Sequence, residues 1–196
     1  MRKGKKTRDQ EEAAFWNREF SANDVRKKSL DDLNYISFST EPFYPLTLLG
    51  ADLSSQFLAE NEEAKQILSR FLFLENQKIV NLNHLSNTDL KFMYGVANLN
   101  ILTEYDSNYS ELITLLHTYG SLLADAGYES QALTVLEYAI SIGSDISTTY
   151  LLCAKLYQKM NQPEAIDALK KEAEKIPTSR KTSIVRKLQE FDPCND

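Results

Sequence analysis

Residues 115–143 read LLHTYGSLLADAGYESQALTVLEYAISIG, and this stretch decides the fold. Leu116, Tyr119 and Leu123 recur at helical spacing, and Gly127 then marks a turn. A second apolar stripe follows the turn and consists of Ala132, Leu136 and Ala139. The stretch therefore predicts two helices joined by a short connection.

The same pattern returns 34 residues later, in TTYLLCAKLYQKMNQPEAIDALKKEAEKIP at residues 148–177. Gly120 of the first stretch corresponds to Ala154 of the second, and Asn161 takes the place of the turn glycine. Small residues let the paired helices approach closely, and glycine or asparagine tolerates a left-handed turn. The remaining matched positions of the second stretch are Tyr150, Cys153, Tyr157, Ala165, Leu169 and Pro177.

This pattern resembles the tetratricopeptide (TPR) repeat, whose period is 34 residues. The match covers residues 111–177, about a third of the chain. It departs from the family in three ways: Leu116 stands where tryptophan is usual, the second repeat is one residue short before Ala165, and Glu172 occupies a small-residue position. The resemblance implies an all-α fold of αα-hairpins in a right-handed superhelical stack. An irregular α-bundle with a coincidental repeat is the alternative.

A TPR-like unit cannot bury both faces alone, so neighbouring helices are required. We expect a degenerate helical pair in residues 51–110, with helices at 54–75 and 87–106 and a turn at Asp106-Ser107-Asn108. Ser86 or Asn87 would cap the second of these helices. At the other end, residues 178–191 predict a capping helix whose apolar stripe is Ile184, Val185, Leu188 and Phe191.

Residues 9–50 predict an irregular N-terminal arm. A helical stretch at 9–28 would pack on the domain through Trp16 and Phe20, or else form a stalk leading away from a membrane. Residues 29–50 contain prolines that break regular structure, so we expect an extended segment lying against helices. Its expected aromatic anchors are Tyr35, Phe38, Phe43 and Tyr44.

The charge is unevenly distributed along the chain. The formal net charge is −6, yet the first eight residues carry +5, which leaves −11 for the remainder. An acidic body repels phosphates, so we expect no binding to nucleic acid. The basic residues of this N-terminal segment are Arg2, Lys3, Lys5, Lys6 and Arg8.

Two interpretations of the basic residues 1–8 stay open. They form a disordered solubilising tail, or they are the juxtamembrane flank of a membrane helix that precedes Met1. In either case they would add weak affinity for an anionic membrane surface. No run in the chain approaches the about 20 apolar residues of a membrane span, and the two cysteines suit a reduced compartment. We therefore expect a cytoplasmic protein, at the inner face of the membrane if an anchor precedes it.

The TPR resemblance also implies a binding surface. In that family the first helix of each pair lines a groove that holds an extended peptide or a partner helix. The corresponding residues are Thr114, His117, Ser121 and Asp125 in the first repeat, and Thr148, Leu151, Lys155 and Lys159 in the second.

The sequence offers no convincing catalytic group. His84 and His117 lie in no metal-ligand pattern, and Gly95 is followed by neither the glycine nor the lysine of a phosphate loop. We interpret Gly95 as marking the point where two helices cross closely. The expected function is a non-catalytic protein-interaction scaffold without cofactor or metal, with oligomerisation through an unfilled end left open. The alternative is a membrane-tethered assembly subunit with its acidic body on the cytoplasmic side.

Overall fold

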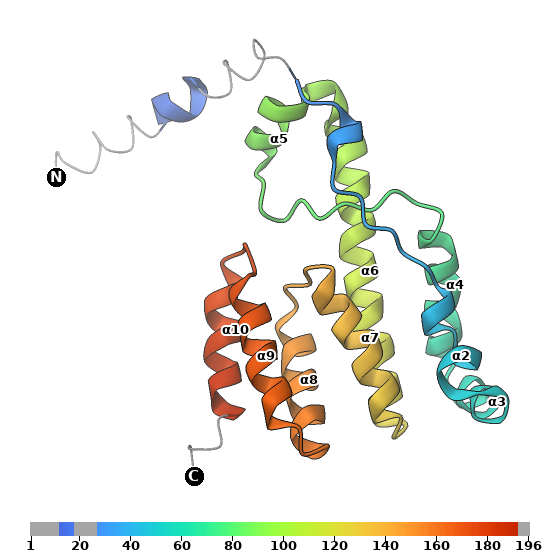
Figure 1. Cartoon of the computed structure of the whole chain (residues 1–196). Coiled ribbons are helices and arrows are strands. Elements are labelled where there is room, and N and C mark those ends of the chain that lie inside the picture. The colour runs from blue at the N-terminus through green and yellow to red at the C-terminus, as the bar shows by residue number, and fades with distance from the viewer. Residues whose placement is uncertain (1–11, 18–26, 192–196) are drawn as a thin grey trace.

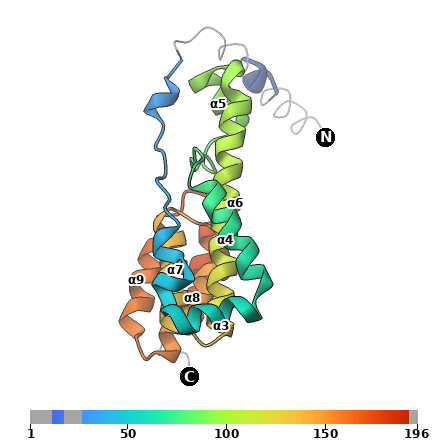
Figure 2. The same ribbon diagram turned by 90° about the vertical axis from the view of Figure 1, so that its right-hand side faces the viewer.

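The longest helix, α6 (Leu99–Asp125), runs the full height of the molecule and packs against α4, α5, α7 and α8 (Figures 1 and 2). The computed structural model describes residues 12–17 and 27–191, which are helical apart from turns, short 3-10 segments and connections. The protein is therefore all-α over its described residues. The other named helices are α2 (Pro45–Leu49), α3 (Ala51–Glu60), α4 (Glu62–Leu74), α5 (Asn87–Tyr94), α7 (Glu129–Ser141), α8 (Ser147–Lys159), α9 (Pro163–Glu174) and α10 (Arg180–Leu188).

The predicted turn at residues 106–108 is wrong, because α6 passes through it without a break. These polar side chains bind a neighbouring segment instead of their own backbone. Asp106 accepts a hydrogen bond from the backbone N–H of Leu82 (2.9 Å), and the Asn108 amide donates to the carbonyl of Lys78 (3.0 Å). The segment around residues 78–82 thus crosses α6 with its polar groups satisfied.

Two hydrophobic clusters share α6. The larger one takes the C-terminal part of the helix, where Tyr109, Leu116 and Leu123 are fully buried among α3, α4 and α7–α10. The smaller one surrounds Leu102 near the N-terminal end. Its other buried members come from the arm, the crossing segment and α5, and they are Leu33, Val80, Leu82, Leu90 and Tyr94.

The hairpins that the sequence predicts are present. The α6–α7 and α8–α9 pairs are joined by turns with left-handed residues, at Gly127 (φ 84°) and Asn161 (φ 56°). The close approach at Gly120 is also present, because a Cβ built there would lie 2.6 Å from Leu136. The predicted capping helix is α10, and its Ile184 and Leu188 are buried.

Several expected boundaries differ from the observed ones. The expected helix at 54–75 is split at Asn61, whose amide donates to the carbonyl of Phe57 and whose backbone is not helical. Gly95 ends α5 with φ 86° and is not a helix crossing, so the expected helix at 87–106 also divides there. Ser86 caps α5 through a capping box with Asp89, as predicted.

The N-terminal arm agrees with prediction in part. Phe38 and Phe43 are buried against α4 and α7, whereas Tyr44 is 41% exposed and is not an anchor. Trp16 is 52% exposed, so the expected packing of its side chain on the domain is not observed. Phe20 and the basic residues Arg2, Lys3, Lys5, Lys6 and Arg8 lie outside the described residues.

The contact between Gly120 and Leu136 sets the spacing of α6 and α7, and it gives a first prediction. We expect Gly120→Ala to lower the free energy of unfolding by about 1–2 kcal/mol, because overpacking outweighs the gain in helix propensity. Chemical denaturation measures this, with Ser121→Ala as control and an expected change within about 0.5 kcal/mol. A Gly120→Ala protein as stable as wild type would contradict the packing constraint.

Candidate binding surface on α6 and α8

The eight residues predicted to line a groove lie on α6 and α8, and all of them keep some solvent exposure. Thr114, Asp125, Thr148, Lys155 and Lys159 are exposed. His117, Ser121 and Leu151 are half-buried. α6 and α8 contact each other directly, and we refer to these eight positions together as the α6–α8 face.

His117 joins the two helices. Its Nε2 lies 3.1 Å from the hydroxyl of Thr148, and its Nδ1 lies 3.2 Å from the hydroxyl of Thr149. Burial lowers the pKa of His117, so the neutral ring is favoured and can donate to one threonine while it accepts from the other. The imidazole is thus a hydrogen-bonded link between helices.

The C-terminal half of α8 carries the two lysines of the face. Lys159 forms an ion pair with Glu129 at the start of α7. Lys155 is exposed, and no described residue pairs with its ammonium group. Lys159 lies eleven residues after Thr148, so it is about 16 Å along α8 from the His117 link. The structure therefore groups Thr114, His117 and Thr148 near one another and places Lys159 apart from them.

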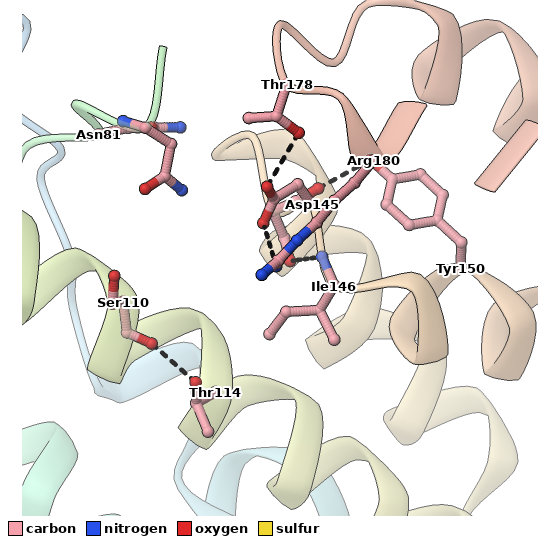
Figure 3. A network of polar contacts seen from close by, with 10 residues as sticks. Asn81, Ser110, Thr114, Asp145, Ile146, Tyr150, Thr178 and Arg180 are labelled. Carbon is pink, nitrogen blue, oxygen red and sulfur yellow. Dashed lines mark hydrogen bonds and ion pairs between the residues drawn. The ribbon is translucent and has the colours of Figure 1, made fainter. Parts of the chain in front are cut away.

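A cavity of about 450 Å³ lies beside the first group (Figure 3). It is open to solvent and lies between the middle of α6, the residue Asn83 that follows the crossing segment, and the loops that precede α8 and α10. Of the eight predicted residues, Thr114 lines it. The other lining residues are Asn83, Ser110, Ile113, Asp145, Ile146, Thr178, Ser179 and Arg180.

Asp145 is the central polar group of this cavity and is only 5% exposed. Its carboxylate accepts a hydrogen bond from the hydroxyl of Thr178 (3.0 Å) and pairs with the guanidinium of Arg180 (3.2 Å). These contacts tie the α7–α8 loop to the start of α10. These two bonds, from the half-buried Thr178 hydroxyl and the exposed Arg180 guanidinium, offset the cost of burying the carboxylate.

Neighbouring groups fix the shape of the α7–α8 loop. The hydroxyl of Tyr150 donates to the carbonyl of Ser144 (3.0 Å), and the backbone N–H of Ile146 donates to the Ser144 hydroxyl (3.3 Å). Figure 3 shows Ile146 and Tyr150 close to Asp145, with Ser110 and Thr114 on the neighbouring helix. The loop therefore presents Asp145 from a constrained backbone.

The sequence reasoning missed Asp145, Thr178 and Ser110. One signal would have found Thr178, since the repeat shift of 34 residues carries Ser144 onto it. Both positions lie in loops that precede the first helix of a pair. Loops of successive repeats lie side by side, so polar residues in both can bond to each other.

The buried thiol of Cys153 has no chemical role that its surroundings support. Burial raises its pKa to about 12, so the reactive thiolate is disfavoured. Among residues 12–17 and 27–191, no three His, Cys, Asp or Glu side chains are grouped closely enough to hold a metal ion. In the same part of the chain, no helix combines the length and the apolar character needed to cross a bilayer.

Comparison of the chain with protein-family models, curated proteins and solved structures finds no match. The assignment of a repeat family and of a function therefore depends on the residues and their geometry.

The His117 link gives a prediction of pH dependence. Its pKa is lower in the folded chain than the ordinary value of 6.5, so the unfolded chain binds this proton more tightly. The free energy of unfolding should thus fall as the pH drops below about 6.5, and His117→Gln should remove that part of the pH dependence. Denaturation experiments at pH values from about 8 to about 5.5, which bracket the ordinary pKa of histidine, measure this. His84→Gln, at an exposed histidine, is the control. Equal pH profiles for His117→Gln and wild type would contradict it.

The Asp145 contacts give a second prediction for the site. Asp145→Ala should cost about 1–3 kcal/mol of stability, because Thr178 and Arg180 lose their acceptor. Amide hydrogen exchange should rise first in α10, which these contacts attach to the loop. The exposed Asp167→Ala is the control, with an expected change below about 0.5 kcal/mol. Unaltered exchange in α10 would show that Asp145 does not hold that helix.

Proposed function

We propose that this chain is a non-catalytic protein-interaction scaffold. It is a right-handed superhelical stack of TPR-like hairpins that binds an extended peptide or a partner helix on the α6–α8 face. The observation that carries the proposal is the direct contact between the first helices of successive hairpins, through His117 and Thr148. That contact makes their outer sides one continuous surface.

The hairpin geometry supports the repeat assignment. α6–α7 and α8–α9 are successive helical pairs, and α10 packs on α8 and α9 as a further first helix would. Gly120 and Ala154, related by the 34-residue shift, are both buried. The matched turn residues Gly127 and Asn161 both have positive φ. A stack of this kind produces the extended surface that repeat proteins use for binding.

The chemistry of the face supports a peptide or helix as its ligand. The upper part offers hydroxyls and a polar cavity, Leu151 is a partly exposed apolar side chain, and Lys155 is an exposed cation. An extended peptide can use such a row of groups, because its backbone forms hydrogen bonds and its side chains supply apolar and charged contacts along its length. The cavity beside Asp145 would take one side chain of that ligand.

Quantitative capture from a lysate of the source organism tests the proposal. The immobilised chain is compared with Lys155→Glu on the α6–α8 face and with Lys171→Glu, the same charge change on α9. We expect Lys155→Glu to reduce retention of the bound partners by about tenfold or more, because it reverses a charge inside the interface. Lys171→Glu should retain them.

Partners that both variants capture like wild type would bind a surface other than the α6–α8 face. Circular dichroism and thermal unfolding of each variant serve as the control for folding. Binding measurements with the purified partner then give the change in dissociation constant for each substitution.

A further inference from the structure

Charge is segregated along the described chain. Residues 27–146 carry six Lys or Arg and sixteen Asp or Glu side chains, a net charge of −10. Residues 147–191 carry nine and five, a net charge of +4. The molecule therefore has an acidic part, which includes α3 and α4, and a basic part, which includes α10.

The basic part ends in an open helix face. α10 packs on α8 and α9 through Ile184 and Leu188, and a shallow groove of about 670 Å³ runs along it, lined also by Glu174 of α9. Lys181, Val185 and Gln189 follow each other at four-residue intervals along this groove, with Thr182 and Arg186 beside them. Lys181 and Arg186 are exposed, and no ion pair joins them to a described residue. We call this surface the α10 end.

The acidic part ends in α3 and α4, and this surface combines negative charge with exposed apolar groups. Asp52, Glu60, Glu62 and Glu63 lie on these two helices and are all exposed. α4 also carries Lys65, which pairs with Glu62, and Arg70, which pairs with Glu111 and lies over the ring of Phe73. Asp52, Glu60 and Glu63 are therefore the carboxylates left for a partner. Three large apolar side chains accompany them, namely Leu53 (45% exposed), Leu72 (50%) and Phe73 (47%). Large exposed apolar side chains beside charged residues are typical of surfaces that another protein covers. We call this surface the α3–α4 end.

The two ends lie on opposite sides of the molecule. Figure 1 shows α10 at one side of the row of helices and α3 and α4 at the other, and Figure 2 shows α3 and α4 in front when that side faces the viewer. One chain therefore cannot bring its own ends together. Two copies can, and they would place Arg186 and Lys181 of one against the acidic side chains of the other.

From this arrangement we infer that the chain associates with a second copy head to tail, with the α10 end of one copy packing on the α3–α4 end of the next. The groove along Val185 receives apolar side chains from α3 and α4, and the flanking cations face carboxylates. Because the two joined faces differ, every pair keeps one free end of each kind. Association therefore grows with concentration beyond a dimer and forms linear oligomers.

The interface uses one short helix on one side, so the association is weak. A helix of 9 residues on one side buries less surface area than the interfaces of stable complexes do. We expect wild type to change from monomer to higher species between about 10 μM and about 1 mM in sedimentation velocity. Raising the salt from about 0.15 M to about 1 M should reduce the higher species, since the Debye length falls from about 8 Å to about 3 Å. A wild-type protein that stays monomeric throughout overturns the inference.

Charge reversal locates the interface. Arg186→Glu at the α10 end and Glu63→Lys at the α3–α4 end should each weaken association by about tenfold. Their matched controls make the same charge changes away from both ends, with Lys28→Glu in the N-terminal arm beside α5 and Glu104→Lys on the N-terminal half of α6. If the control variants weaken association as much, the effect comes from the net charge of the protein and not from these two surfaces, and the inference is overturned.

Mixing the two reversed variants completes the test. In the mixture, the unchanged α10 end of the Glu63→Lys protein meets the unchanged α3–α4 end of the Arg186→Glu protein, so association should return. This restoration also shows that both variants are folded. A mixture that stays monomeric, or one in which two copies join through the same end, overturns the head-to-tail arrangement. The α6–α8 face is not involved, so this result is independent of the capture experiment above.

Discussion

The helix α6 contributes buried residues to two hydrophobic clusters, and this constraint governs the arrangement of the other elements. Its N-terminal part buries Leu102 among the arm, the crossing segment and α5. Its C-terminal part buries Tyr109, Leu116 and Leu123 among α4 and the hairpins. A helix of 27 residues is about 40 Å long, which exceeds the diameter of a single small core. The chain therefore builds a second cluster to cover the upper part.

Polar side chains hold together the places where non-helical segments meet helices. Asp106 and Asn108 bind the backbone of the crossing segment, and Asp145 binds the start of α10 from the preceding loop. In each case the contact joins residues at least 24 positions apart in the sequence. A buried backbone group or carboxylate without such a partner would cost more than these bonds contribute. The bonds therefore select one arrangement of the segments more than they add stability.

The sequence predicts the local parts of this structure well and the distant contacts poorly. Helical spacing, Gly127 and Asn161 identify both hairpins, because turns and apolar stripes depend on neighbouring residues. The turn expected at Asp106-Ser107-Asn108 is wrong because such polar residues have two uses. They form a turn when they bond to their own backbone, and they lie on a helix surface when they bond to a distant segment, as Asp106 and Asn108 do. Asp145 escapes detection for a similar reason, because its partner Arg180 lies 35 residues away. Of the predicted groove, the repeat places His117 and Thr148 on successive first helices, while the hydrogen bond between them and the cavity depend on side chains and loops that the repeat does not specify.

The α6–α8 face lies at the boundary between the acidic and the basic parts of the chain. Asp125 ends α6 on one side of this face, and Lys155 and Lys159 extend along α8 on the other. A partner that crosses from α6 to α8 therefore meets opposite charges in a fixed order. Charges on the rim of an interface contribute more to orientation and association rate than to affinity. The same segregation that distinguishes the α10 end from the α3–α4 end thus also gives the α6–α8 face a direction, and under the proposed function a bound chain would have a preferred polarity on it.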